Sequence, residues 1–237
     1  MLGSTPRLFI FDMGGVVTGT VHCIPSMVER LGLAMEEFMA AADAGPIPGS
    51  SEAGPMPGSD GPHPYNRGDL RAIQNGSLSP DEFWDRFEGR CARLFPAKNI
   101  RVPRLADGSY EDLWGTYFSP LRDEGTVDVI RSLSGAGFRV VCGTNTLPAH
   151  FAVHQAKGDY AIFDAVYTSH LMLLLKPDGG FWRHILRSEG VEPWEAFFVD
   201  DLDENVQAAR AVGLSAHRFV DAVTLRQDLA ARGIALR

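Results

Sequence analysis

The fold is decided by the stretch Leu8-Phe9-Ile10-Phe11-Asp12-Met13-Gly14-Gly15-Val16-Val17 near the start of the chain. A short apolar run that ends in a carboxylate and two glycines is typical of a buried strand that leads into a tight turn. We therefore predict a strand over residues 7–12, with Asp12 at its carboxyl end.

Four similar apolar runs occur later, separated by stretches with helical periodicity or helix-ending glycines. They cover residues 138–143, 163–168, 196–200 and 214–220. The helical spacing is carried by Val127, Ile130 and Leu133, by Val206, Ala209 and Val212, and by Ala222, Leu225 and Leu229. Alternating strands and helices predict an α/β fold with a parallel sheet.

Residues 20–121 differ from this pattern, because they carry helical signals and lack a convincing strand. The firmest helix begins at Ser79-Pro80-Asp81-Glu82, which supplies an N-cap, a proline at the first helical position and a capping glutamate. One face of this helix is predicted to consist of Phe83, Phe87, Cys91 and Leu94. We predict a helical domain at 20–121, inserted into a core formed by 1–19 and 122–237.

A glycine- and proline-rich segment lies inside the insert at residues 45–61. Gly45-Pro46-Ile47-Pro48-Gly49-Ser50 is nearly repeated as Gly54-Pro55-Met56-Pro57-Gly58-Ser59, which predicts an irregular loop. A polar group, His63, Tyr65, Asn66 and Arg67, follows it. This group either reaches a binding site or belongs to a solvated loop.

Composition narrows the class of protein. The 237 residues are 45% hydrophobic and 22% charged, as in folded globular proteins, and the formal net charge is −8. An acidic chain without a basic run is repelled by nucleic acid and by anionic membranes, so we expect neither as a partner.

The first residues and the cysteines indicate the compartment. Residues 1–11 carry one charge, Arg7, and an apolar run too short for a signal peptide or a membrane span. Cys23, Cys91 and Cys142 lie far apart, which favours reduced, buried thiols over disulfides or a zinc site. We expect a cytoplasmic protein.

Polar residues stand at the predicted carboxyl ends of the strands, where open parallel sheets bind ligands. They are Asp12, Thr144-Asn145, Lys176-Pro177 and Asp200-Asp201. Taken singly, an aspartate there is usually a turn residue, Thr-Asn a helix cap and a lysine a solvated side chain. Two adjacent aspartates after an apolar strand are less ordinary, because burial of like charges is costly without a cation.

In this order the four positions resemble the motifs of the haloacid dehalogenase superfamily: a nucleophilic aspartate, a serine or threonine, a lysine and an acidic pair. Residues 11–17, Thr144-Asn145-Thr146 and Phe198-Val199-Asp200-Asp201 with Asn205 and Ala209 are most similar to its glucose-1-phosphate phosphatase-like branch. The resemblance implies a Rossmann-like parallel sheet with an inserted helical cap.

The resemblance also implies the roles of the site residues. Asp12 would be the nucleophile, and Mg²⁺ would be bound by Asp12, the carbonyl of Gly14, and Asp200 or Asp201. Thr144, Asn145 and Lys176 would bind the phosphate. These roles describe a hydrolase, a Mg²⁺-dependent phosphatase that acts on a small phosphorylated metabolite such as a sugar phosphate, through an aspartyl-phosphate.

Two departures from the superfamily pattern leave alternatives open. Gly14 stands where a second aspartate usually acts as general acid, so His22 or His150 are candidate substitutes, although each fits a capping or surface position better. An apolar run at 171–175 precedes Lys176, where a polar stretch is usual. Besides a phosphatase, the sequence therefore admits a 2-haloacid dehalogenase or a binding module that has lost turnover.

Overall fold

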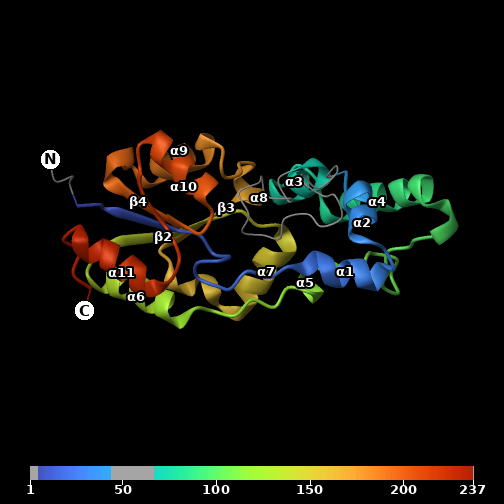
Figure 1. The fold of residues 1–237 in the computed structure, drawn as a ribbon, viewed down its shortest axis with the longest axis horizontal. Coiled ribbons are helices and arrows are strands. Elements are labelled where there is room, and N and C mark those ends of the chain that lie inside the picture. The colour runs from blue at the N-terminus through green and yellow to red at the C-terminus, as the bar shows by residue number, and fades with distance from the viewer. Residues whose placement is uncertain (1–4, 44–66, 237) are drawn as a thin grey trace.

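The computed structural model describes residues 5–43 and 67–236 of the chain and shows a five-stranded, fully parallel sheet (Figure 1). The strands are β1 (Leu8–Phe11), β2 (Arg139–Thr144), β3 (Ala165–Thr168), β4 (Ala196–Asp200) and β5 (Ser215–Arg218), in the order β3-β2-β1-β4-β5. The predicted parallel α/β sheet is confirmed. The edge strands β3 and β5 are shorter than predicted, because their ladder registers cover residues 165–168 and 215–218. Beyond these registers, Asp164 N still donates to Val140 O and Phe219 N to Asp200 O, each at 2.8 Å.

Two layers of helices cover the faces of the sheet, as Figure 1 shows. Successive side chains of a strand point to opposite faces. Leu8 and Ile10 of β1 therefore pack with α9 (Gly179–Glu189) and α10 (Asp203–Val212). Phe9 and Phe11 pack on the other side with α6 (Glu124–Gly135) and α11 (Ala222–Ala231). Because β1 is buried on both faces of the sheet, its sequence is an unbroken run of apolar residues.

The helical periodicities of the sequence are borne out. Val127, Ile130 and Leu133 of α6 are fully buried, as is Leu225 of α11. The remaining core elements are α7 (Pro148–Lys157), η3 (Asp159–Ile162), α8 (Ser169–Met172) and η4 (Pro193–Glu195). No helix among the described residues is long and apolar enough to cross a lipid bilayer.

Between β1 and α6, the described residues form the helical insert. Its elements are α1 (Cys23–Leu31), α2 (Met35–Ala41), α3 (Gly68–Gln74), α4 (Pro80–Leu94), η2 (Pro96–Lys98) and α5 (Leu113–Thr116), with one isolated bridge between Arg104 and Tyr110. The predicted capping box of α4 is present: Glu82 N donates to Ser79 Oγ at 3.2 Å, and Ser79 N donates to the Glu82 carboxylate at 3.0 Å. The loop at 45–61, together with His63, Tyr65 and Asn66, lies outside the described residues, while Arg67 precedes α3 as its N-cap.

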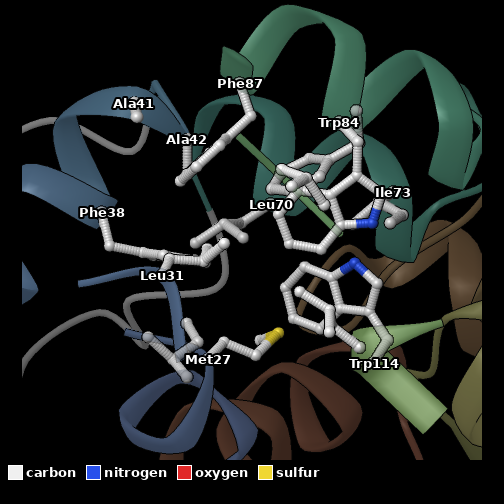
Figure 2. Close-up of a cluster of buried hydrophobic side chains, with 14 of the residues drawn as sticks. Met27, Leu31, Phe38, Ala41, Ala42, Leu70, Ile73, Trp84, Phe87 and Trp114 are labelled. Atoms are coloured by element: carbon white, nitrogen blue, oxygen red, sulfur yellow. The ribbon is translucent and has the colours of Figure 1, made fainter. Parts of the chain in front are cut away.

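The buried apolar side chains of the insert form one hydrophobic cluster, part of which Figure 2 shows and to which the core contributes Leu147. Trp84 of α4 stacks on Trp114 of α5, with ring centroids 5.7 Å apart, and Phe83 meets the edge of Trp84 at 4.9 Å. Phe83, Phe87 and Cys91 are buried as predicted. The prediction for Leu94 was wrong: this last residue of α4 lies beyond the cluster and is 45% exposed.

The two connections between the insert and the core run side by side. Gly19 N donates to Leu121 O at 2.9 Å, and Asp123 N donates to Val17 O at 2.9 Å. Next to this pair, Phe118 stacks on His150 of α7 with ring centroids 3.8 Å apart. The insert therefore leaves and re-enters the core at one place.

Two tryptophans provide a test of the insert cluster. Trp84→Ala should lower the free energy of unfolding by about 3–5 kcal/mol, because it removes a buried indole that the neighbouring rings cannot replace. Trp194→Ala removes an indole that is 62% exposed and should cost less than about 0.5 kcal/mol. Urea unfolding followed by circular dichroism measures both values, and equal losses would contradict the packing described here.

Candidate active site

The strand order gathers the polar residues at one edge of the sheet. Asp12 follows β1 directly, Thr144 ends β2 and Asp200 ends β4. Because β1 lies between β2 and β4, these side chains stand next to one another at the carboxyl ends. The chain changes direction across the sheet at this point, which is where open α/β sheets place their ligands.

Lys176 lies at the centre of this group. Its Nζ is 2.9 Å from Asp12 Oδ1 and 2.7 Å from Asp200 Oδ2, and its side chain is 1% exposed. Burial disfavours the ammonium, but the charges of Asp12 and Asp200 outweigh this effect and raise the pKa of Lys176 above its usual range. The lysine is therefore a fixed positive charge beside Asp12.

Asp200 is held by several donors. Asn205 Nδ2, on α10, donates to both carboxylate oxygens at 2.9 and 3.1 Å, and Leu202 N donates to Oδ1 at 2.9 Å. Burial raises the pKa of Asp200 to about 7 despite the opposing charge of Lys176. Asn205, one of the residues that carry the family resemblance, therefore orients this carboxylate.

The second acidic residue, Asp201, packs against the turn after β1. A Cβ added at Gly15 would lie 2.3 Å from Asp201 Oδ2, and Gly15 adopts a φ of +79°. Burial, followed by the charge of Asp12, raises the pKa of Asp201 to about 6. Gly15 is therefore required both by its backbone conformation and by the close approach of Asp201.

The donor set fits a divalent cation. Asp12, Asp200 and Asp201 each offer a carboxylate oxygen, and these atoms lie within 4.8 Å of one another. Oxygen atoms are the ligands of hard cations such as Mg²⁺. Two of the three carboxylates, those of Asp12 and Asp200, contact the ammonium of Lys176, so a further positive charge would compensate the remaining negative charge.

Asn145 contacts the backbone on either side of this lysine. Its Oδ1 accepts from Lys176 N at 2.9 Å and its Nδ2 donates to Lys176 O at 3.0 Å. The predicted substrate-binding amide thus has both ends engaged with Lys176, which gives it a positioning role in this structure. Thr144 is buried, and its hydroxyl lies 3.4 Å from Asn145 O, at the limit of a hydrogen bond.

The surroundings of His22 and His150, the candidate substitutes for the missing general acid, do not favour proton donation by either imidazole. His22 is exposed at the start of α1, and its side chain makes no capping bond to the described helix. His150 packs between Phe118 and Cys23, whose Sγ is 3.5 Å from Nε2. Burial lowers the pKa of His150 to about 3, so its imidazole is neutral at physiological pH.

The apolar run at 171–175 forms the end of α8 and the turn after it. Leu171 and Leu173 are 69% and 62% exposed, whereas Leu175 is 2% exposed. Leu173 also adopts a positive φ of 59°, which is uncommon for this side chain. α8 lies next to α3 of the insert in Figure 1, so the start of the run borders the insert.

Comparison with known proteins identifies the family. The sequence model of the haloacid dehalogenase-like hydrolase family matches residues 6–213. The chain belongs to this family of hydrolases. The match concerns the superfamily as a whole, and membership of the glucose-1-phosphate phosphatase-like branch stays a prediction.

Solved structures of this family share the fold. A family enzyme from Bacteroides thetaiotaomicron, in complex with magnesium and inorganic phosphate, aligns over 91% of this chain and 95% of its own, with a TM-score of 0.62 and 17% identity. The L-2-haloacid dehalogenase of Xanthobacter autotrophicus aligns over 98% and 85%, with a TM-score of 0.56 and 16% identity. These likenesses concern the fold alone.

The curated relatives match over part of their length. A sesquiterpene phosphatase of Aspergillus oryzae is 32% identical over 108 residues, which are 45% of this chain and 55% of that protein. A flavin mononucleotide hydrolase of Arabidopsis thaliana is 27% identical over 112 residues, 47% of this chain and 45% of that protein. The chain thus spans about half the length of these two relatives.

Gly15 and Gly14 form a matched pair for testing the cation site. Gly15→Ala would push Asp201 away from Asp12 and should weaken Mg²⁺ binding by roughly tenfold or more. At Gly14 none of the described atoms lies within 4 Å of an added Cβ, and its φ is not positive, so Gly14→Ala should bind Mg²⁺ as the wild type does. Calorimetric titration measures the affinities, and equal binding by the two variants would place the cation away from Asp201.

Proposed function

We propose that the protein is a Mg²⁺-dependent phosphatase that hydrolyses a small phosphorylated metabolite through an aspartyl-phosphate on Asp12. The observation that carries the proposal is the meeting of three carboxylates within 4.8 Å beside the buried ammonium of Lys176. Phosphoryl transfer needs a nucleophile, charge compensation and positioning of the phosphate oxygens, and this group provides all three.

The cation would be held by Asp12, Asp200 or Asp201 and the carbonyl of Gly14. When bound, Mg²⁺ supplies charge compensation for the phosphate oxygens and aligns them with the nucleophile. Lys176 adds a second fixed positive charge, oriented by Asn145. Thr144, at the neighbouring strand end, offers its hydroxyl as a donor to the phosphate.

The reaction proceeds in two displacements. A carboxylate oxygen of Asp12 attacks phosphorus, a new O–P bond forms and the bond to the leaving oxygen breaks. Water then attacks the aspartyl-phosphate, which releases inorganic phosphate and restores Asp12. Because Gly14 carries no acid, the proton taken up by the leaving oxygen comes from solvent or from a group that the substrate brings.

Residues 20–121 would act as a cap that opens and closes over this edge of the sheet. The paired connections at Gly19 and Leu121 give such a motion one hinge region. A cap of this kind selects the organic part of the substrate. The names of the relatives suggest trial substrates, so a panel should contain sugar phosphates, flavin mononucleotide and a sesquiterpenyl phosphate.

The dehalogenase alternative is disfavoured by the acidic cluster. Attack on a carbon–halogen bond uses an aspartate nucleophile and needs no cation. In such an enzyme Asp200 and Asp201 would bind no metal ion, and their negative charges would repel Asp12. A binding module without turnover has no need for the ordered set of nucleophile, lysine and carboxylates. A dehalogenase would keep its activity in EDTA, whereas a binding module would bind a phosphorylated ligand tightly without turnover of any substrate.

Replacement of the nucleophile tests the mechanism. Asp12→Asn keeps the shape of the side chain but removes the nucleophile and one cation ligand, so turnover should fall by roughly a thousandfold or more with the fold intact. Asp203→Asn, an exposed acid on α10, is the control and should keep the wild-type rate. The measurement is phosphate release with Mg²⁺ and after EDTA; a near-normal rate of Asp12→Asn, or resistance to EDTA, would refute the proposal.

The identity of residue 14 leads to a prediction about leaving groups. Without an acid at this position, the enzyme should prefer a sugar 1-phosphate to the matching 6-phosphate, because the anomeric oxygen leaves more easily as an anion. Gly14→Asp should raise the rate on alkyl phosphates by up to about a hundredfold. The turn accepts a Cβ at this position, since Gly14 has no positive φ and none of the described atoms lies within 4 Å of an added Cβ.

A series of aryl phosphates with graded leaving-group pKa values measures this effect directly. The logarithm of kcat/KM should fall steeply as the pKa of the leaving group rises, and less steeply for Gly14→Asp. A flat dependence in the wild type, with the chemical step shown to limit the rate, would mean that another residue donates the proton. His22 would then be the first residue to replace, and His150 the second.

A further inference from the structure

A second contact joins the helical insert to the core, away from the paired connections. α8 follows β3 and lies beside α3 of the insert (Figure 1). The contact centres on Ser169, whose side chain is fully buried. Its Oγ lies 2.6 Å from Gln74 O, the last residue of α3, 3.0 Å from Thr146 O and 2.9 Å from Thr146 N.

Two carbonyl oxygens lie within hydrogen-bond distance of the Ser169 hydroxyl, which can donate to one of them at a time. Thr146 N–H donates to the Oγ, and the hydroxyl has one proton to give, either to Gln74 O or to Thr146 O. The 2.6 Å distance to Gln74 O is the one typical of a strong O–H···O bond. If α3 moves away, the proton can turn to Thr146 O, so undocking leaves the hydroxyl satisfied.

The approach of the insert is tight at the adjacent residues. A Cβ added at Gly76 would lie 2.1 Å from His170 O, and Gly76 adopts a φ of +73°. A glycine is therefore required for α3 to reach α8 this closely. The two contacts, Gln74 with Ser169 and Gly76 with His170, form one docking surface.

On the core side, this docking surface is connected to the candidate active site through residues 144–146. Thr146 follows Thr144 and Asn145, and Asn145 holds the backbone of Lys176. Lys176 in turn contacts Asp12 and Asp200. Within residues 144–146, Asn145 is thus held by the backbone of Lys176, and Thr146 by the hydroxyl of Ser169.

We propose that Ser169 is a positioning residue that couples docking of the helical insert to the geometry of residues 144–146. In the docked arrangement its hydroxyl links Gln74 O to Thr146 N–H in a region closed to water. Undocking uncovers the hydrogen bond from Thr146 N–H to the Ser169 hydroxyl, so that water can compete for it, and this loosens the segment that presents Thr144 and Asn145. The catalytic consequence rests on the proposed phosphatase function, whereas the coupling itself does not.

Amide hydrogen exchange tests the coupling without reference to turnover. Ser169→Ala removes both links and should accelerate exchange of the Thr146 amide by about tenfold. Gly76→Ala keeps Ser169 and Thr146 intact but blocks docking, and it should accelerate the same amide by a similar factor. This distant effect separates coupling from a merely local structural role.

Two control variants match these substitutions. Thr168→Val removes a neighbouring buried hydroxyl that makes no hydrogen bond with the described residues. Gly32→Ala introduces the same backbone strain in the insert, at a φ of +66°, without a described atom within 4 Å of the added Cβ. Both should leave the exchange of Thr146 at the wild-type rate.

The outcomes separate the coupling from the proposed function. Wild-type exchange of Thr146 in Gly76→Ala, or acceleration equal to it in Gly32→Ala, would overturn the coupling. In the phosphatase assay, Ser169→Ala and Gly76→Ala should each lower kcat by about tenfold, and their effects should not add in the double variant. If the wild type releases no phosphate from any substrate, the proposed function fails while the exchange experiment still decides the coupling.

Discussion

The buried ammonium of Lys176 between Asp12 and Asp200 is the interaction on which the rest of the site depends. Carboxylates placed this close together repel one another, and burial without a positive charge would protonate them. The lysine allows Asp12 to lie at the end of β1 beside β4. The position of Lys176 is set in turn by Asn145, which follows β2 and makes hydrogen bonds to the backbone N–H and C=O of the lysine. Three neighbouring strands thus share one electrostatic constraint.

The sheet supplies the rigidity that this arrangement requires. Its two faces are packed by separate hydrophobic clusters, so the strand ends are held from both sides. The site residues stand where the strands end and the backbone is free to turn. The insert is stabilised by a third cluster, built around Trp84 and Trp114, to which the core contributes Leu147.

The two glycines after Asp12 illustrate how differently adjacent positions are constrained. Gly15 is fixed by a left-handed backbone and by Asp201, so the acidic pair and the first turn belong to one structural unit. Gly14 has an ordinary conformation and open surroundings. The backbone would accept a larger residue there, so the absence of a side chain is not explained by the conformation of the turn.

The sequence by itself determined the features that follow from local pattern. Apolar runs and helical spacing predict the strands and helices, the capping box predicts the start of α4, and the ordered motifs predict which residues meet at the site. The prediction that Leu94 belongs to the packed face of α4 was wrong. The helical spacing of apolar residues continues to the last residue of α4, whereas the hydrophobic cluster against which the helix packs does not reach that far.

Only the tertiary structure reveals the partners of Asn145, Asn205 and Ser169. Each acts through hydrogen bonds to a segment that the fold brings near: Asn145 to Lys176, Asn205 to Asp200, and Ser169 to Gln74 and Thr146. An amide or hydroxyl carries no sign of its partner in the sequence, because the partner is selected by strand order and helix packing. Burial, which shifts the pKa values of Asp200 and His150, is likewise a property of the packed chain.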